Sequence, residues 1–81
     1  MTQQEYNEMS ILLKTNYGAT EVSLDKNMLT VYGSDVDAVY IAVVVEYGHL
    51  YDVTYEQRDE ANKQVVLKLE HKVVDNINKL V

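Results

Sequence analysis

Three side chains near the middle of the chain have types and spacing that could hold a divalent metal ion. Glu46, His49 and Asp52 follow one another at intervals of three residues, and imidazole and carboxylate groups are common metal ligands. They flank a predicted turn at Gly48, however, and the alternation of a strand would send them to different faces. We therefore expect no metal site here.

The serines do not form a recognisable catalytic arrangement with the two histidines. Ser10, Ser23 and Ser34 fall at a predicted mid-helix position, a strand exterior and a turn or helix cap. The sequence has no cysteine, and it carries no nucleophile elbow, phosphate-binding loop or dinucleotide glycine motif. We expect no catalytic residue and no cofactor, and hence a protein that is not an enzyme.

Tyrosines and carboxylates gather in the same part of the chain. There are seven Tyr and no Phe or Trp, and no Lys or Arg occurs from Asn27 to Gln57. Tyr and carboxylates together suit a partner rich in Arg and Lys. The alternative is that the tyrosines fill the core beneath the helices. The first interpretation predicts a partner-binding set of Glu46, Tyr51, Asp52, Tyr55, Glu56 and Asp59.

The composition excludes several classes of protein. The 81 residues carry a net charge of −6, so the basic stripe that neutralises phosphates in direct nucleic-acid binders is missing. The longest uncharged apolar run, Ala38 to Val45, is far shorter than the roughly 20 residues that span a bilayer. The start lacks the basic and apolar pattern of a signal peptide. We expect one small domain over 1–81, located in the cytoplasm and not bound to a membrane.

The first half of the chain predicts a helix followed by a hairpin. Thr2 and Glu5 form a potential capping box, apolar residues then recur at helical spacing, and Gly18 can end the helix. The predicted helix covers 3–16. From Glu21 to Tyr32 apolar and polar residues alternate around a turn at 25–27, as in a half-buried hairpin.

Residues 35–47 allow two interpretations. A helix would begin at Ser34 and end at Gly48, but it would be apolar all round, and a small two-layer domain could hardly cover it. A strand is favoured by the many β-branched and aromatic residues. We therefore expect a strand here and a further strand over 51–56, where polar and apolar residues alternate again.

The C-terminal part predicts a long amphipathic helix from about Asp59. Its apolar stripe is made of Val66, Leu69, Val73, Ile77 and Leu80. The competing interpretation makes Val65, Leu67 and Leu69 a strand after a turn at 59–62, followed by a short last helix. The predicted fold class is α+β, with an N-terminal helix, an antiparallel sheet of about four strands and this long helix.

If 35–47 is instead a helix, the order from Glu21 to Tyr55 becomes β-β-α-β. This order resembles the later part of a ferredoxin-like fold, such as that of heavy-metal-associated domains. The metal-binding Cys-x-x-Cys of that family has no counterpart here, so the resemblance implies a topology and no activity.

Together these features predict a small acidic protein that binds another protein. The expected partner is a basic protein surface, such as that of a nucleic-acid-binding protein. In size and acidity the chain resembles phage-encoded inhibitors of host defence, among them anti-CRISPR proteins, some of which are DNA mimics. The alternative is a homo-oligomeric structural or regulatory protein, a homodimer assembled through the Val66–Leu80 stripe.

Overall fold

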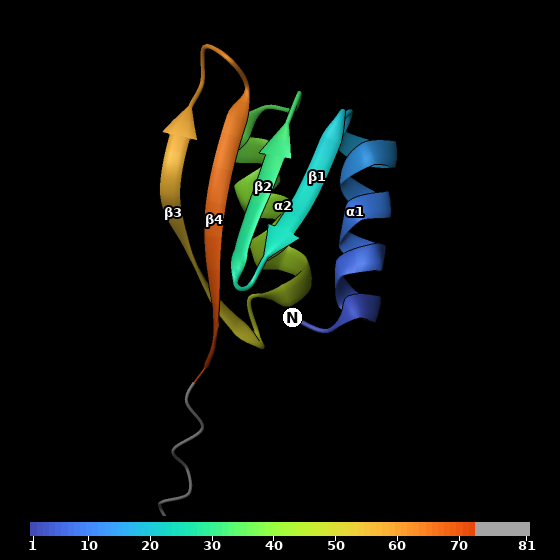
Figure 1. The fold of residues 1–81 in the computed structure, drawn as a ribbon, viewed down its shortest axis with the longest axis vertical. Helices are drawn as coiled ribbons and strands as arrows, with labels where there is room; N and C mark the ends of the chain where they lie inside the picture. Colours follow the sequence, from blue (N-terminus) through green and yellow to red (C-terminus); the bar gives the residue numbers. More distant parts are fainter. Residues whose placement is uncertain (73–81) are drawn as a thin grey trace, which may run out of the picture.

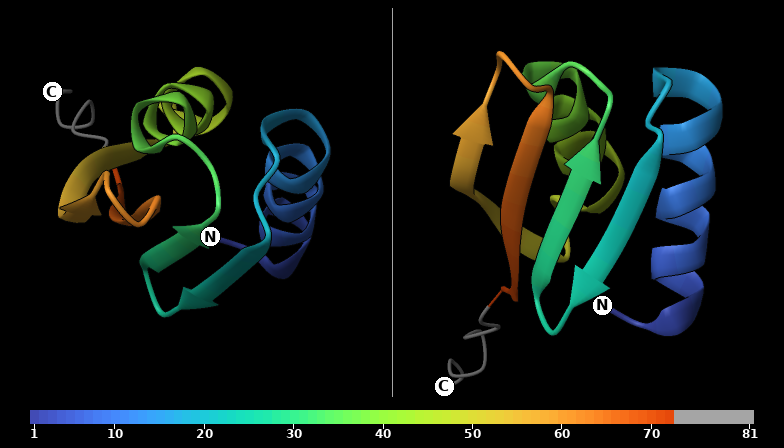
Figure 2. Two further views of the ribbon diagram at one scale, coloured as in Figure 1. Left: turned by 90° about the horizontal axis from the view of Figure 1, so that it is seen from above. Right: turned by 45° about the horizontal axis from the view of Figure 1, so that its top comes forward.

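The computed structural model describes residues 1–72, which form two helices and four strands in the order α1, β1, β2, α2, β3, β4. All four strands pair in one antiparallel sheet with the order β1-β2-β4-β3. Both helices lie against the same face of this sheet (Figure 1 and Figure 2). The predicted α+β class with a four-stranded antiparallel sheet is therefore confirmed.

Helix α1 (Gln3–Tyr17) begins and ends with the residues that its sequence predicts. The Glu5 amide donates to Thr2 Oγ1 at 3.1 Å, and the Thr2 amide donates back to Glu5 Oε1 at 2.9 Å, which completes the capping box. Gly18 has φ of 75° and ends the helix in the left-handed conformation. Met9 and Leu13 face the core. The helix predicted over 3–16 is confirmed.

Strands β1 (Glu21–Asp25) and β2 (Met28–Tyr32) form the predicted hairpin. A two-residue loop, Lys26-Asn27, joins them, and Lys26 adopts a positive φ of 60°. The alternation of the sequence matches the alternation of burial: Val22, Leu29 and Val31 are buried. The register is fixed because a slip of one residue would send these side chains to solvent.

Residues 35–47 form a helix, α2 (Val36–Tyr47), so the strand expected there is wrong. Asp35, not Ser34, is the N-cap: its side chain accepts from the Ala38 amide at 3.0 Å. The sequence favours a strand only if a helix that is apolar all round must be covered on every side. The protein instead leaves one side of α2 in solvent, where Ile41 and Val45 are 58% and 71% exposed.

Residues 51–71 form a second hairpin, of β3 (Tyr51–Asp59) and β4 (Gln64–His71). The strand predicted over 51–56 is confirmed and is longer. The long helix expected from Asp59 is wrong, and the competing strand with buried Val65, Leu67 and Leu69 is observed. Val66 and Leu69 lie on opposite faces of this strand. The other members of the expected stripe lie outside the described residues: Val73, Ile77 and Leu80.

The core fills the space between the helices and the face of the sheet that they cover. Its buried members come from all six elements, and include Leu13, Val22, Leu29, Val39, Tyr51 and Leu67. Strand β4 lies between β2 and β3, so β2, α2 and β3 form a split β-α-β unit. The β-β-α-β order from Glu21 to Tyr55, given as the ferredoxin-like alternative, is thus the order observed.

Candidate protein-binding surface

The face of the sheet opposite the helices, here called the open face, is strongly acidic. Among residues 1–72 no helix covers it (Figure 2). Strand register assigns carboxylates to it from β1, β3 and β4, and Lys68, which pairs with Glu70 at 3.4 Å, is the single base that the strands themselves place there. These carboxylates are Glu21, Asp25, Asp52, Asp59 and Glu70.

A β-bulge in β3 keeps a second base away from the open face. The register shifts between Tyr55 and Gln57, so that Arg58 lies opposite the buried Val65. If Glu56 were paired in a regular strand, alternation from Tyr55 would turn Arg58 toward the open face. The bulge places the guanidinium on the side of the helices, beside Tyr55.

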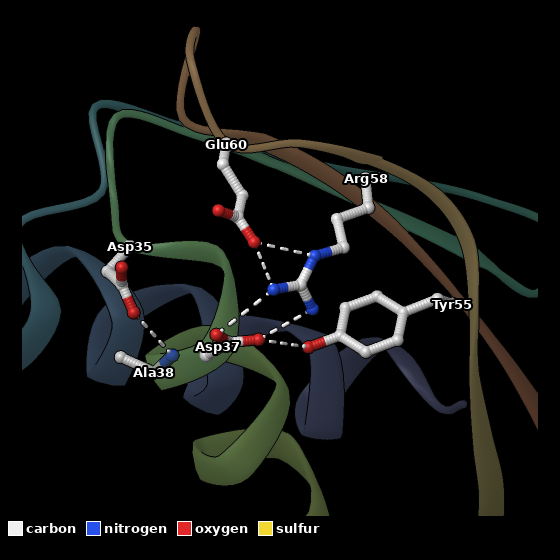
Figure 3. A network of polar contacts seen from close by, with 6 residues as sticks. All are labelled: Asp35, Asp37, Ala38, Tyr55, Arg58 and Glu60. Atoms are coloured by element: carbon white, nitrogen blue, oxygen red, sulfur yellow. Dashed lines mark hydrogen bonds and ion pairs between the residues drawn. The ribbon is translucent and has the colours of Figure 1, made fainter.

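Arg58 is held there by two carboxylates (Figure 3). Its Nη1 lies 2.6 Å from Asp37 Oδ1, and its Nη2 donates to Asp37 Oδ2 at 3.1 Å. It also donates to Glu60, through Nε at 2.9 Å and through Nη2. The Tyr55 hydroxyl donates to Asp37 at 3.0 Å, and the Tyr55 ring stacks on Tyr40 with centroids 4.7 Å apart.

The electrostatics of this group follow from its hydrogen bonds. Those donated by Arg58, and then by Tyr55, hold the pKa of Asp37 below its usual value. The same carboxylate bonds raise the pKa of Arg58. The group ties the β3–β4 hairpin to the first turn of α2, and Arg58 is therefore engaged in structure and does not offset the open face.

The predicted aromatic anchors do not share a surface with the predicted carboxylates. Tyr51 is 2% exposed, and its hydroxyl donates to Glu5 Oε1 at 2.7 Å. Burial, followed by this bond, raises the pKa of Tyr51 to about 12. Its ring contacts His71, with centroids 4.5 Å apart. Tyr51 thus belongs to the core, as the alternative interpretation of the tyrosines proposes, and Tyr55 is half-buried beside Arg58.

The predicted carboxylates are distributed over three places. Asp52 is exposed on the open face, and Glu56 is exposed at the bulge next to it. Asp59 ends β3 and accepts from the Asn62 side chain at 2.8 Å, which lowers its pKa. Glu46 is exposed on α2, in the helical layer. The structure brings together Asp52, Glu56 and Asp59 on one strand and separates them from Glu46.

Sequence reasoning missed Glu21, Asp25 and Glu70 of the open face. It followed the base-free stretch Asn27–Gln57, which excludes all three. The signal was nevertheless present for β1, because the alternation of the hairpin already put Glu21 and Asp25 on its polar side. Glu70 could not be found, since its segment was interpreted as a helix.

A shallow hollow of about 220 Å³ lies beside the beginning of β3. It is lined by α2 and β3 residues and by Lys72 at the end of the described chain: Tyr40, Val44, Gly48, Tyr51, Asp52, Val53 and Lys72. Within residues 1–72, no three His, Asp or Glu side chains are grouped so that they could hold a metal ion. The described helices also include none long and apolar enough to cross a membrane.

Comparison of the chain with protein-family models, with curated proteins and with solved structures gives no match.

Proposed function

We propose that the chain is a small, non-enzymatic protein-binding module that presents its open face to a basic partner. The observation that carries this proposal is the distribution of charge. Five carboxylates and one ammonium group lie on the uncovered face, whereas Arg58 is paired on the other side. Such a face favours partners with exposed Lys and Arg and speeds their association.

The arrangement of the carboxylates suits a nucleic-acid-binding protein as the partner class. Glu21 and Asp25 mark one edge of the sheet, and Asp52 and Asp59 mark the other. With strands about 4.8 Å apart, the two acidic edges are separated by roughly 14 Å. A basic groove that accepts two rows of phosphates could accept these two rows in their place.

The resemblance in size and acidity to phage-encoded anti-CRISPR inhibitors agrees with this proposal and extends it. In this form of the proposal, the protein is a DNA mimic in the cytoplasm that occupies the nucleic-acid site of a host defence protein. Direct binding of nucleic acid is not expected, because phosphates would meet the same carboxylates.

The test is capture of partners from lysates of candidate host cells by the immobilised protein, with the captured proteins identified by mass spectrometry. Partners of the proposed class are basic and bind nucleic acid. They are released between about 50 and 500 mM salt, since screening weakens charge-steered complexes. Duplex DNA added in excess displaces them if the open face occupies their nucleic-acid site.

Two double variants with the same net charge locate the surface. Glu21→Gln with Glu70→Gln removes two open-face carboxylates, and Glu8→Gln with Glu46→Gln removes two from the helical layer. Both change the net charge from −6 to −4. Loss of capture with the first pair alone supports the proposal. Equal loss with both pairs would show that only net charge matters, and loss with the second pair alone would move the site to the helices.

A second candidate function, homo-oligomeric assembly, is favoured by one observation. Helix α2 exposes Ile41, Val44 and Val45 on its outer side, and exposed apolar side chains in a group often mark an interface. The surface would then be α2 and not the stripe expected from Val66 to Leu80. Light scattering at micromolar concentration distinguishes the two: a mass of 9.3 kDa excludes a stable homo-oligomer.

A further inference from the structure

The two edges of the sheet differ in how well they are protected. Edge strand β1 is five residues long and packs beside α1, whose Tyr6 hydroxyl donates to the Val22 carbonyl at 2.9 Å. Edge strand β3 is nine residues long, and its first five residues pair regularly with β4 and contain neither Pro nor Lys, residues that commonly protect such edges. The bulge at Glu56, another protective device, lies beyond this regular part. Figure 1 shows β3 as the outermost strand at the side away from α1.

A hydrogen bond at the end of the β3–β4 ladder shows which backbone N–H and C=O groups of β3 point away from β4. The Lys72 amide donates to the Leu50 carbonyl at 3.0 Å, which makes these residues a bonded pair. Bonded pairs recur at every second residue of an antiparallel ladder, so Asp52 and Thr54 also point their backbone groups at β4. Val53 and Tyr55 therefore direct their N–H and C=O groups outward.

A second hydrogen bond independently supports this assignment of inward and outward backbone groups. The Leu69 amide donates to the Asn27 carbonyl at 2.9 Å, which directs Leu69 toward β2 and away from its β3 neighbour, Val53. The Tyr40 hydroxyl lies 3.5 Å from the outward carbonyl of Val53, at the limit of hydrogen bonding. That carbonyl has a second lone pair for another donor.

The side chains along this edge specify what could pair with it. On the open-face side, Asp52 and the bulge residue Glu56 supply carboxylates. On the helical side, the hollow of about 220 Å³ is bordered by Tyr40 and Val44 of α2 and by Val53, and its rim also includes Asp52 and Lys72. A strand laid against β3 would meet negative charge on one face and a partly apolar recess on the other.

We propose that β3 accepts an extended segment of the partner as a fifth, antiparallel strand, with basic residues alternating with apolar ones. The inference rests on the proposed function and specifies the form in which a basic partner binds. Residues opposite Val53 and Tyr55 form bonded pairs with them and share their face, so these are the apolar residues. The basic residues lie between them, next to Asp52 and Glu56.

The probe is a blocked seven-residue peptide of alternating basic and valine residues, KVRVKVR, titrated into the full chain and followed by NMR. We expect saturable shifts along β3 and slower hydrogen exchange at the Val53 and Tyr55 amides, which an added strand would cover. A peptide of the same composition in block order, KKRRVVV, should bind about tenfold more weakly because it cannot match both faces.

Two N-methylated forms of the probe test the backbone pairing without altering the protein. Methylation of the valine amides removes the donors that face β3 in an antiparallel addition, and we expect about a tenfold loss of affinity. Methylation of the Lys and Arg amides leaves those donors intact and should change affinity by less than about threefold. The opposite result would require a parallel strand, and equal effects would overturn strand addition.

Substitutions in the protein complete the test. Val53→Pro removes an outward N–H and no hydrogen bond to β4, so the variant should fold but no longer bind the KVRVKVR peptide. Val53→Ala controls for the lost side chain and should still bind the peptide. If Val53→Pro does not fold, the exchange data and the methylated peptides on the unaltered chain decide.

The charge variants separate failure of this inference from failure of the proposed function. Asp52→Asn with Glu56→Gln should weaken binding and flatten its salt dependence. Binding that depends on these carboxylates but not on Val53→Pro or methylation would overturn the fifth strand and leave the acidic surface standing. Binding that depends on the backbone but not on the carboxylates would overturn both the basic segment and the proposed function.

Discussion

Leu69→Ala compared with Val66→Ala tests the pairing of β4 directly. Leu69 is 2% exposed on the helix-covered face of the sheet, and its neighbour Val66 lies half-buried on the open face. Truncation of a buried Leu costs about 2–5 kcal/mol, because the cavity adds to the lost transfer free energy. Truncation of the half-buried Val should cost roughly 1 kcal/mol, since its side chain is only partly removed from water.

These costs are large relative to the whole stability of the chain. Domains of about 80 residues have free energies of unfolding near 4–12 kcal/mol, and each kcal/mol lowers the melting temperature by about 4–8 °C. Leu69→Ala should therefore melt at least roughly 8 °C below the parent protein and reach its urea midpoint earlier. Val66→Ala should remain within several degrees, as measured by circular dichroism.

Equal destabilisation by the two variants would refute this reasoning. On a helix, positions three residues apart share a face, so equal costs would indicate that Leu69 and Val66 pack on the same side. On a strand, an odd separation puts them on opposite sides. A loss at Val66 that equals the loss at Leu69 would also arise if the open face were covered in solution by a second copy, and light scattering distinguishes that case.

Tyr51, Asp52 and the exposed side of α2 each give a measurable effect. Stability should fall as pH rises from 10 through 12, because the raised pKa of Tyr51, about 12, means that its neutral form is favoured by folding; urea midpoints of Tyr51→Phe should show a smaller fall. Asp52→Asn should stabilise the fold by less than about 0.5 kcal/mol in urea unfolding, since Asp52 lies directly opposite Glu70 and like charges repel, while Lys68, 3.4 Å from Glu70, offsets part of the repulsion. Ile41→Lys with Val45→Lys should leave the melting temperature within about 3 °C, because both side chains are exposed, while any homo-oligomer seen by light scattering becomes a monomer.

The parts of the fold that could be predicted from the sequence are those whose determinants are local. The capping box and Gly18 lie within α1 or next to it, and the β1–β2 hairpin has a two-residue loop with clear alternation on both sides. In each of these segments, propensity, periodicity and turn chemistry agree. Agreement among those signals is what makes a local pattern specific for one structure.

The two errors arose where local patterns are ambiguous and tertiary context decides. Residues 36–47 have β-branched residues typical of a strand, yet the Asp35 cap and packing of Val39 and Val43 against the core favour a helix. In 64–71 a pattern that suits a helical stripe also suits a strand, because Val65, Leu67 and Leu69 alternate. Pairing of this segment with both β2 and β3 resolves the ambiguity, and long-range pairing leaves no local signal.

The candidate site was only partly predictable for a related reason. A count of charges along the chain found Asp52, Glu56 and Asp59, which are close in sequence, but membership of a sheet face depends on register across strands. The bulge at Glu56 shows most clearly why a face cannot be read from the sequence alone. It moves Arg58 to the helix-covered face of the sheet, whereas regular alternation from Tyr55 would have put this base among the carboxylates. The acidity of the open face thus depends on how β3 pairs with β4 as well as on composition. Deletion of Glu56 would leave Arg58 opposite Val65 in a regular strand, so the irregular pairing of the longer strand, and not the Glu56 side chain itself, keeps this base off the open face.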